Sequence, residues 1–199
     1  MSKLPRKRTV FFGALLIGAS AVLLPAAWSE RIDPAPASAS ASAGSAELAQ
    51  RHRLTGEVWV SGQIEAADMA VAKAEGFRAV VALRPDGEVP EQPAADDMRS
   101  IADAQGLAFF YVPVPQGELP DAVAEELGAA LAQAEGPVLL YCRSGRRAVR
   151  AWATAEAARQ DGLRAHEILA AAAKAGHPAS DLTERLLQRV DGRGLNSRG

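Results

Sequence analysis

The sequence is poor in cysteine and histidine and nearly balanced in charge, and these scarcities exclude several classes of protein. Its single cysteine, Cys142, cannot form a disulfide framework within the chain. The three histidines lie far apart and show no metal-ligand spacing, so we expect no metal and no cofactor: they are His52, His166 and His177. The formal net charge of −2 gives no general reason to expect nucleic acid as a partner.

The N-terminus has the three parts of a secretory signal. Basic residues at 3–8 precede an apolar stretch over 10–24, and small residues around Ala27 and Ser29 follow. The same stretch is nearly long enough for an uncleaved membrane anchor, so residues 1–29 are predicted to be a signal peptide or an anchor. We expect the rest of the chain to be periplasmic, secreted or held on the inner membrane facing the periplasm, with membrane contact only through this segment.

The remainder has an ordinary globular composition, with 48% hydrophobic and 23% charged residues. Residues 30–53 include the Ala/Ser/Pro-rich run DPAPASASASAGSA and are predicted to form a flexible linker. One folded domain is expected over 54–190, followed by a flexible tail over 191–199.

Strand and helix patterns alternate through the folded part. Short apolar segments predict strands over 57–60, 78–83, 107–112 and 137–141. Helical periodicity predicts helices over 65–75, 94–105, 121–135, 147–160, 165–175 and 180–190. This alternation indicates an α/β fold, in which a short central parallel sheet is flanked by helices. Ligands of such folds bind at the carboxyl ends of the strands, so three loops should converge on one site: 84–93, 113–120 and 142–147.

Positive charge surrounds the only cysteine. The apolar run VLLY ends at residue 141, and Arg143, Arg146 and Arg147 then cluster at the predicted start of a helix. Cations are disfavoured there by about 0.3–1 kcal/mol each, so an anionic partner explains their presence. That partner is a cysteine thiolate, which helix N-termini and cations stabilise, or a bound oxyanion.

Residues 142–147, which we call the cysteine loop, therefore predict a nucleophile in an anion-binding cradle. Gly145 allows the backbone to approach an anion closely, and Ser144 can hydrogen-bond the sulfur or fix the loop. A lone cysteine at the end of an apolar run can also be an inert buried hydrophobe. We expect instead that the Cys142 sulfur is ionised and exposed.

Four motifs in a fixed order carry a family resemblance. They are VSGQ (60–63), VVALRPDGE (80–88), YVPVPQGE (111–118) and YCRSGRR (141–147). Together they resemble the beta-lactamase-hydrolase-like phosphatase family, a bacterial branch of the dual-specificity-phosphatase-like superfamily whose members are also labelled sulfurtransferases. The resemblance spans about residues 54–175. It implies a protein-tyrosine-phosphatase-like α/β fold, with Cys142 as nucleophile in a loop that binds phosphate or a similar anion.

The sequence departs from the phosphatase signature at two points. The signature Cys-x5-Arg would require arginine where Ala148 stands, whereas Arg147 gives Cys-x4-Arg, the loop length of rhodanese-like sulfurtransferases. Phosphatases of this group carry an acidic residue after the third strand, and that position falls near Gln116, which cannot act as an acid. Glu118 and Asp121 are the candidate replacements.

A further anion ligand is expected at the end of the second strand. Arg84 is the candidate there, although a salt bridge to Asp86 or Glu88 would equally explain it. The anion-binding set predicted from the sequence is then Arg84, Arg143, Ser144, Gly145 and Arg146, beside the catalytic candidates Cys142, Arg147, Glu118 and Asp121.

Three functions are compatible with these residues. The first is a cysteine-dependent phosphatase-like hydrolase acting on a small anionic or phosphorylated molecule. The second is a rhodanese-like sulfurtransferase, which would carry sulfane sulfur as a Cys142 persulfide and pass it to a thiol acceptor. The third is a non-catalytic module that binds an anion or a partner. The fold resemblance favours the hydrolase, which we adopt, and the loop length favours the sulfurtransferase.

Overall fold

The computed structural model describes residues 50–117 and 119–196. The predicted signal peptide or anchor over 1–29 lies outside the described residues, as do most of the predicted linker and the candidate acid Glu118. None of the helices in the described part has the length and apolar character that crossing a bilayer requires.

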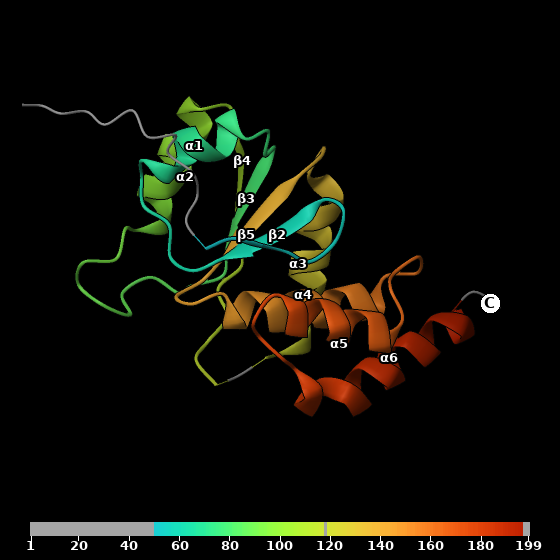
Figure 1. Ribbon diagram of the computed structural model, residues 1–199. Helices are drawn as coiled ribbons and strands as arrows, with labels where there is room; N and C mark the ends of the chain where they lie inside the picture. Colours follow the sequence, from blue (N-terminus) through green and yellow to red (C-terminus); the bar gives the residue numbers. More distant parts are fainter. Residues whose placement is uncertain (1–49, 118, 197–199) are drawn as a thin grey trace, which may run out of the picture. The chain divides into compact units, whose positions relative to one another are not determined.

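A five-stranded sheet with the order β1-β2-β5-β3-β4 forms the centre of the described part (Figure 1). Its strands are β1 (His52–Arg53), β2 (Val58–Ser61), β3 (Ala79–Ala82), β4 (Ala108–Tyr111) and β5 (Val138–Tyr141). Strands β2, β5, β3 and β4 run parallel, and β1 pairs antiparallel with β2 at the edge. The predicted parallel sheet flanked by helices is confirmed.

Helices cover both faces of the sheet because side chains along a strand point alternately to opposite sides. On β3, Val80 faces a core with the buried residues of α1 (Asp68–Ala74) and α2 (Ala95–Ala104). Its neighbour Val81 faces the other core, which α3 (Asp121–Gln133), α4 (Arg146–Ala158), α5 (Ala165–Lys174) and α6 (Thr183–Asn196) complete. Figure 1 shows the two groups of helices on opposite sides of the strands.

The strand that leads to the cysteine is β5, in the middle of the sheet. All four of its residues, VLLY, are buried, as expected for a parallel strand covered on both faces. It pairs with β2 on one side and β3 on the other. The residue after it, Cys142, is therefore held at the carboxyl edge of the sheet between two neighbouring strand ends.

Three element boundaries differ from the sequence prediction. Strand β1 lies within the segment predicted as linker. Its two residues are exposed, and they are too few to show the alternation of buried and exposed side chains that indicates a strand. Helix α1 begins at Asp68 and not at residue 65, because the Asp68 carboxylate accepts the Glu65 N–H at 2.7 Å and forms a turn. Helix α6 runs to Asn196 and includes part of the predicted tail. Long-range hydrogen bonds from Arg193 to the carbonyls of Ala157 and Gly162 anchor this end, which no local pattern reveals.

Candidate active site

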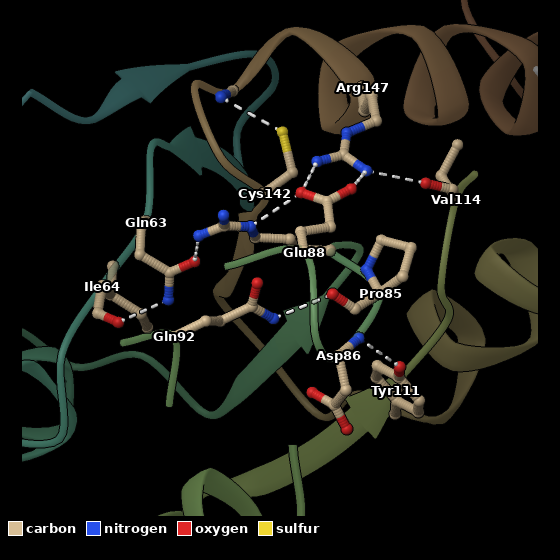
Figure 2. A network of polar contacts seen from close by, with 12 residues as sticks. Gln63, Ile64, Pro85, Asp86, Glu88, Gln92, Tyr111, Val114, Cys142 and Arg147 are labelled. Atoms are coloured by element: carbon tan, nitrogen blue, oxygen red, sulfur yellow. Dashed lines mark hydrogen bonds and ion pairs between the residues drawn. The ribbon is translucent and has the colours of Figure 1, made fainter. Parts of the chain in front are cut away.

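The thiol of Cys142 lies beneath its own loop. Its Sγ accepts a hydrogen bond from the Gly145 N–H at 3.2 Å (Figure 2). The residue is only 1% exposed, because it packs into the core between the sheet and α4. The expectation of an exposed sulfur is therefore wrong.

The backbone of the cysteine loop is turned so that the Gly145 amide faces the sulfur. The Arg143 carbonyl accepts the Gln63 N–H at 3.2 Å, on the side of the loop toward β2. The imidazole of His177, from the segment after α5, lies beside the Ser144 backbone, whose interaction with the ring opposes the lowering of the His177 pKa. In a trans peptide the N–H points opposite to the C=O. The Ser144 carbonyl and the Gly145 N–H belong to one peptide unit, so the carbonyl points away from Sγ while the amide donates to it.

His177 is packed closely against this peptide. A Cβ placed at Gly145 would lie 2.7 Å from its Nε2. Burial lowers the pKa of His177 below its usual value, and the nearby His52 and Arg146 lower it further, while the Ser144 hydrogen bond opposes them.

We expect Gly145→Ala to destabilise the domain more than a glycine substitution with the same backbone angle elsewhere. Gly145 has φ +88°, and its added Cβ would meet His177. Gly76 has φ +89° with nothing within 4 Å of an added Cβ, so Gly76→Ala measures the cost of the backbone angle alone. In urea unfolding, Gly145→Ala should lose about 1–3 kcal/mol more than Gly76→Ala. Equal losses would show that the close packing of His177 on the loop is not restrictive.

Arg147, on the first turn of α4, forms a bidentate ion pair with Glu88 of the loop after β3. Its two terminal nitrogens donate to the two Glu88 oxygens at 2.5 and 2.8 Å (Figure 2). One of them also donates to the Val114 carbonyl at 2.9 Å. These contacts join all three loops that were predicted to converge, and they fix the orientation of the guanidinium. The hydrogen bond to Glu88 is the main cause that raises the pKa of Arg147, while burial opposes it.

Arg84 donates to the same carboxylate as Arg147. Its Nε donates to Glu88 at 2.8 Å, and its Nη1 donates to the Gln63 side chain at 2.8 Å (Figure 2). Arg84 is 6% exposed, so the salt bridge, one of its two predicted roles, is the one formed. Hydrogen bonds from Arg147 and then Arg84 hold the pKa of Glu88 at about 2, against the opposing effect of burial. Glu88 is thus an ionised bridge between two guanidinium groups.

A cavity of about 550 Å³ opens over the cysteine loop. Four of the residues that line it are arginines, and we call it the arginine cavity. Its lining residues are Val114, Gln116, Gly117, Leu119, Arg143, Ser144, Arg146, Arg147 and Arg150. Arg147 thus lines the same cavity as three of the predicted anion ligands, Arg143, Ser144 and Arg146. The described residues that line it include no carboxylate.

The two candidate acids have different positions. Asp121 begins α3, and its exposed carboxylate is bound by Arg185 and Arg189 of α6. These hydrogen bonds lower its pKa, which is opposite to what a proton donor near neutrality requires. Asp121 is not among the residues lining the arginine cavity. Glu118 lies outside the described residues, but its chain neighbours Gly117 and Leu119 line the cavity.

Sequence reasoning missed three residues of the site. His177 is a lone histidine more than thirty positions after Cys142, and no motif connects the two. Gln63 belongs to the VSGQ motif, but its backbone bond to the loop is visible only once β2 and β5 are paired. Arg150 could have been found, because it lies one helical turn after Arg146 and shares its face.

These features define a class of protein. A parallel α/β sheet presents a cysteine at the end of its central strand, and a short loop with an arginine leads from it into a helix. This is the protein-tyrosine-phosphatase-like fold, as the solved structures below confirm.

Comparison with known proteins places the chain more narrowly. Residues 50–159, just over half of the chain, match the family described as beta-lactamase hydrolase-like protein, phosphatase-like domain, and the chain belongs to this family. A comparison with curated proteins gives no match.

Solved structures show the same fold. A proposed phosphatase of Neisseria meningitidis is 28% identical with a TM-score of 0.60, over 69% of this chain and 96% of that one. A proposed phosphatase of Shewanella putrefaciens CN-32 is 18% identical with a TM-score of 0.55, over 72% of this chain and 92% of that one. TpbA of P. aeruginosa, solved in complex with phosphotyrosine, is 18% identical with a TM-score of 0.53, over 75% of this chain and 91% of that one.

Proposed function

We propose that this protein is a cysteine-dependent phosphatase-like hydrolase with the Cys142 thiolate as nucleophile. The observation that carries the proposal is the construction of the cysteine loop. The Gly145 amide points at Sγ, the His177 ring packs closely against Gly145, and Glu88 fixes the Arg147 guanidinium. Amides and a guanidinium that are oriented before substrate binds stabilise the charge on a transferring phosphoryl group.

The reaction would proceed in two displacements. Sγ forms a bond to phosphorus while the bond from phosphorus to the leaving oxygen breaks, and that oxygen takes up a proton. Water then attacks phosphorus, the S–P bond breaks, and inorganic phosphate leaves with regeneration of the thiolate. Loop amides and Arg147 contact the non-bridging oxygens in both steps.

The test is detection of the intermediate. Nitrophenyl phosphate is mixed with the enzyme, the reaction is quenched with acid, and peptides are examined by mass spectrometry. The peptide that contains Cys142 should gain the mass of one phosphoryl group, and nitrophenol should be released. Absence of turnover from acidic to neutral pH would contradict the proposal.

Glu118 is our proposed proton donor, on the basis of its place between two residues that line the arginine cavity. Glu118→Gln should lower kcat by about 10²-fold for an alkyl phosphate, whose leaving oxygen needs a proton. The loss for nitrophenyl phosphate should be much smaller, because nitrophenolate leaves without protonation. Glu125→Gln, at an exposed position of α3, is the matched control. Equal losses for both substrates would show that Glu118 has another role.

A sulfurtransferase is the second candidate, favoured by the six-residue span from Cys142 to Arg147 and by the lack of a carboxylate among the described residues of the cavity. Sγ would attack the outer sulfur of thiosulfate, forming a persulfide and releasing sulfite. Mass spectrometry after thiosulfate treatment should then show one added sulfur on Cys142. An unchanged mass would exclude thiosulfate as the donor.

We also propose that residues 1–29 direct export, so that the domain acts outside the cytoplasm. The basic and apolar parts of this segment support the proposal. Fractionation of cells that express the full chain should recover the domain in the periplasm or on the outer side of the inner membrane. Recovery in the cytoplasm would contradict it.

A further inference from the structure

Two of the arginines in the arginine cavity are already paired with carboxylates. Arg147 is bound by Glu88, and Arg150 donates to both oxygens of Asp181 at 2.9 and 2.7 Å. In both pairs the oxygens occupy the guanidinium fork, which neutralises much of the charge. The positive charges of these two arginines are therefore balanced by carboxylates of the protein itself.

The other two cations have no such partner. The side chains of Arg143 and Arg146 are exposed, and neither guanidinium group makes a hydrogen bond or ion pair with another residue in the part of the chain that the structure describes. Arg146 contributes slightly to the lowered pKa of Asp181, but that carboxylate is taken by Arg150. Two exposed residues of the cavity lining therefore carry guanidinium groups whose donors are available.

The cavity is larger than a single phosphate needs. Its volume of about 550 Å³ lies in the range of sites that enclose a small molecule. A phosphoryl group on the cysteine loop near Sγ would leave part of this volume free, and Arg143, Arg146 and the loop Gln116–Gly117 are among the residues that line the cavity. A second anionic group of the same ligand would meet the two unpaired arginines there.

The lining also indicates what connects the two anionic groups. Sites for aromatic rings usually present aromatic or broad apolar surfaces. No described residue of the lining is aromatic, and its apolar side chains are Val114 and Leu119. A short aliphatic, polar connection suits these walls better than the ring of phosphotyrosine does.

We propose that the arginine cavity selects a small aliphatic molecule with two phosphate groups, one on the cysteine loop and the second on Arg143 and Arg146. The assignment of the first phosphate rests on the proposed function. The place where the second phosphate binds is a separate subsite, because each Arg guanidinium group can donate two parallel hydrogen bonds to phosphate oxygens. Each such contact to a charged group contributes enough to change affinity by about tenfold or more.

The test compares a matched pair of ligands in a variant that cannot turn them over. Calorimetry on Cys142→Ser measures fructose bisphosphate, phosphorylated at both ends, against the fructose monophosphate that lacks one phosphate. The bisphosphate should bind at least about tenfold more tightly. Adding Arg146→Gln or Arg143→Gln should reduce this ratio to about threefold or less. Lys174→Gln, which removes an exposed cation of α5 outside the cavity, should leave the ratio unchanged.

The outcomes separate this inference from the proposed function. Equal affinity for the two sugars in Cys142→Ser overturns the inference, even where the wild-type enzyme hydrolyses phosphate esters. A bisphosphate preference that depends on Arg146 supports it, even where no turnover is found. Tighter binding of a phosphotyrosine peptide flanked by aspartates also overturns it, because the second subsite would then serve a protein substrate.

Discussion

Cys142→Ser is expected to abolish hydrolysis of nitrophenyl phosphate, lowering kcat by at least about 10⁴-fold. A serine hydroxyl is far less ionised than a thiol at neutral pH, so the covalent step loses its nucleophile. The loop amides and Arg147 remain, and binding of inorganic phosphate should therefore persist. Steady-state kinetics together with a phosphate-binding measurement check both parts of this expectation.

The fold should tolerate this substitution. The serine Oγ is smaller than Sγ but still accepts a hydrogen bond, so the Gly145 N–H keeps a partner. Cys142→Ala removes the acceptor within a residue that is 1% exposed and is expected to be less stable than Cys142→Ser in urea. Residual turnover in Cys142→Ser close to that of the wild type would place the nucleophile elsewhere.

The sheet could be predicted because its signals are local. A buried parallel strand such as VLLY is apolar throughout, and the helices between the strands carry clear periodicity. Topology then forces the ends of parallel strands to one edge, which is why three loops could be assigned to a single site. The short edge strand β1 carries no such signal, since its side chains are exposed and only two residues pair.

The arrangement within the site could be predicted only in part. The sequence shows that arginines surround Cys142, but not which of them bind anions and which are held by carboxylates. Glu88 lies 59 positions before Arg147, and their pairing depends on how the loop after β3 folds back toward α4. Burial of the sulfur was missed for a similar reason, because the first turn of α4 covers it only in three dimensions.

Glu88→Gln is the second substitution with a large expected effect. A neutral amide cannot balance Arg84 and Arg147, so Arg84, which is 6% exposed, becomes a buried charge without a counterion. We expect a loss of about 2–4 kcal/mol in the free energy of unfolding at pH 7. The released Arg147 should also lower kcat/KM by about 10²-fold, because its guanidinium is no longer fixed.

The pH dependence of this loss follows from the pKa of Glu88, which falls from 4.5 to about 2 on folding. A carboxylate with a depressed pKa stabilises the fold fully above pH 4.5, and this contribution is lost as the pH falls toward 2. The shift corresponds to at most about 3 kcal/mol, and nearer 1–2 kcal/mol after allowance for solvent screening. The stability difference between wild type and Glu88→Gln should therefore shrink by about 1–2 kcal/mol on acidification, since both then carry a neutral side chain at this position.

Urea unfolding of both proteins at several pH values between 2 and 7 measures this convergence. Glu91→Gln, an exposed glutamate of the same loop, is the matched control and should follow the wild type throughout. A constant difference between wild type and Glu88→Gln across the range would mean that packing of the side chain, and not its charge, stabilises the loop. The ion pair with Glu88 would then not be what orients the Arg147 guanidinium. The proposed chemistry requires that orientation, so another contact would have to fix it.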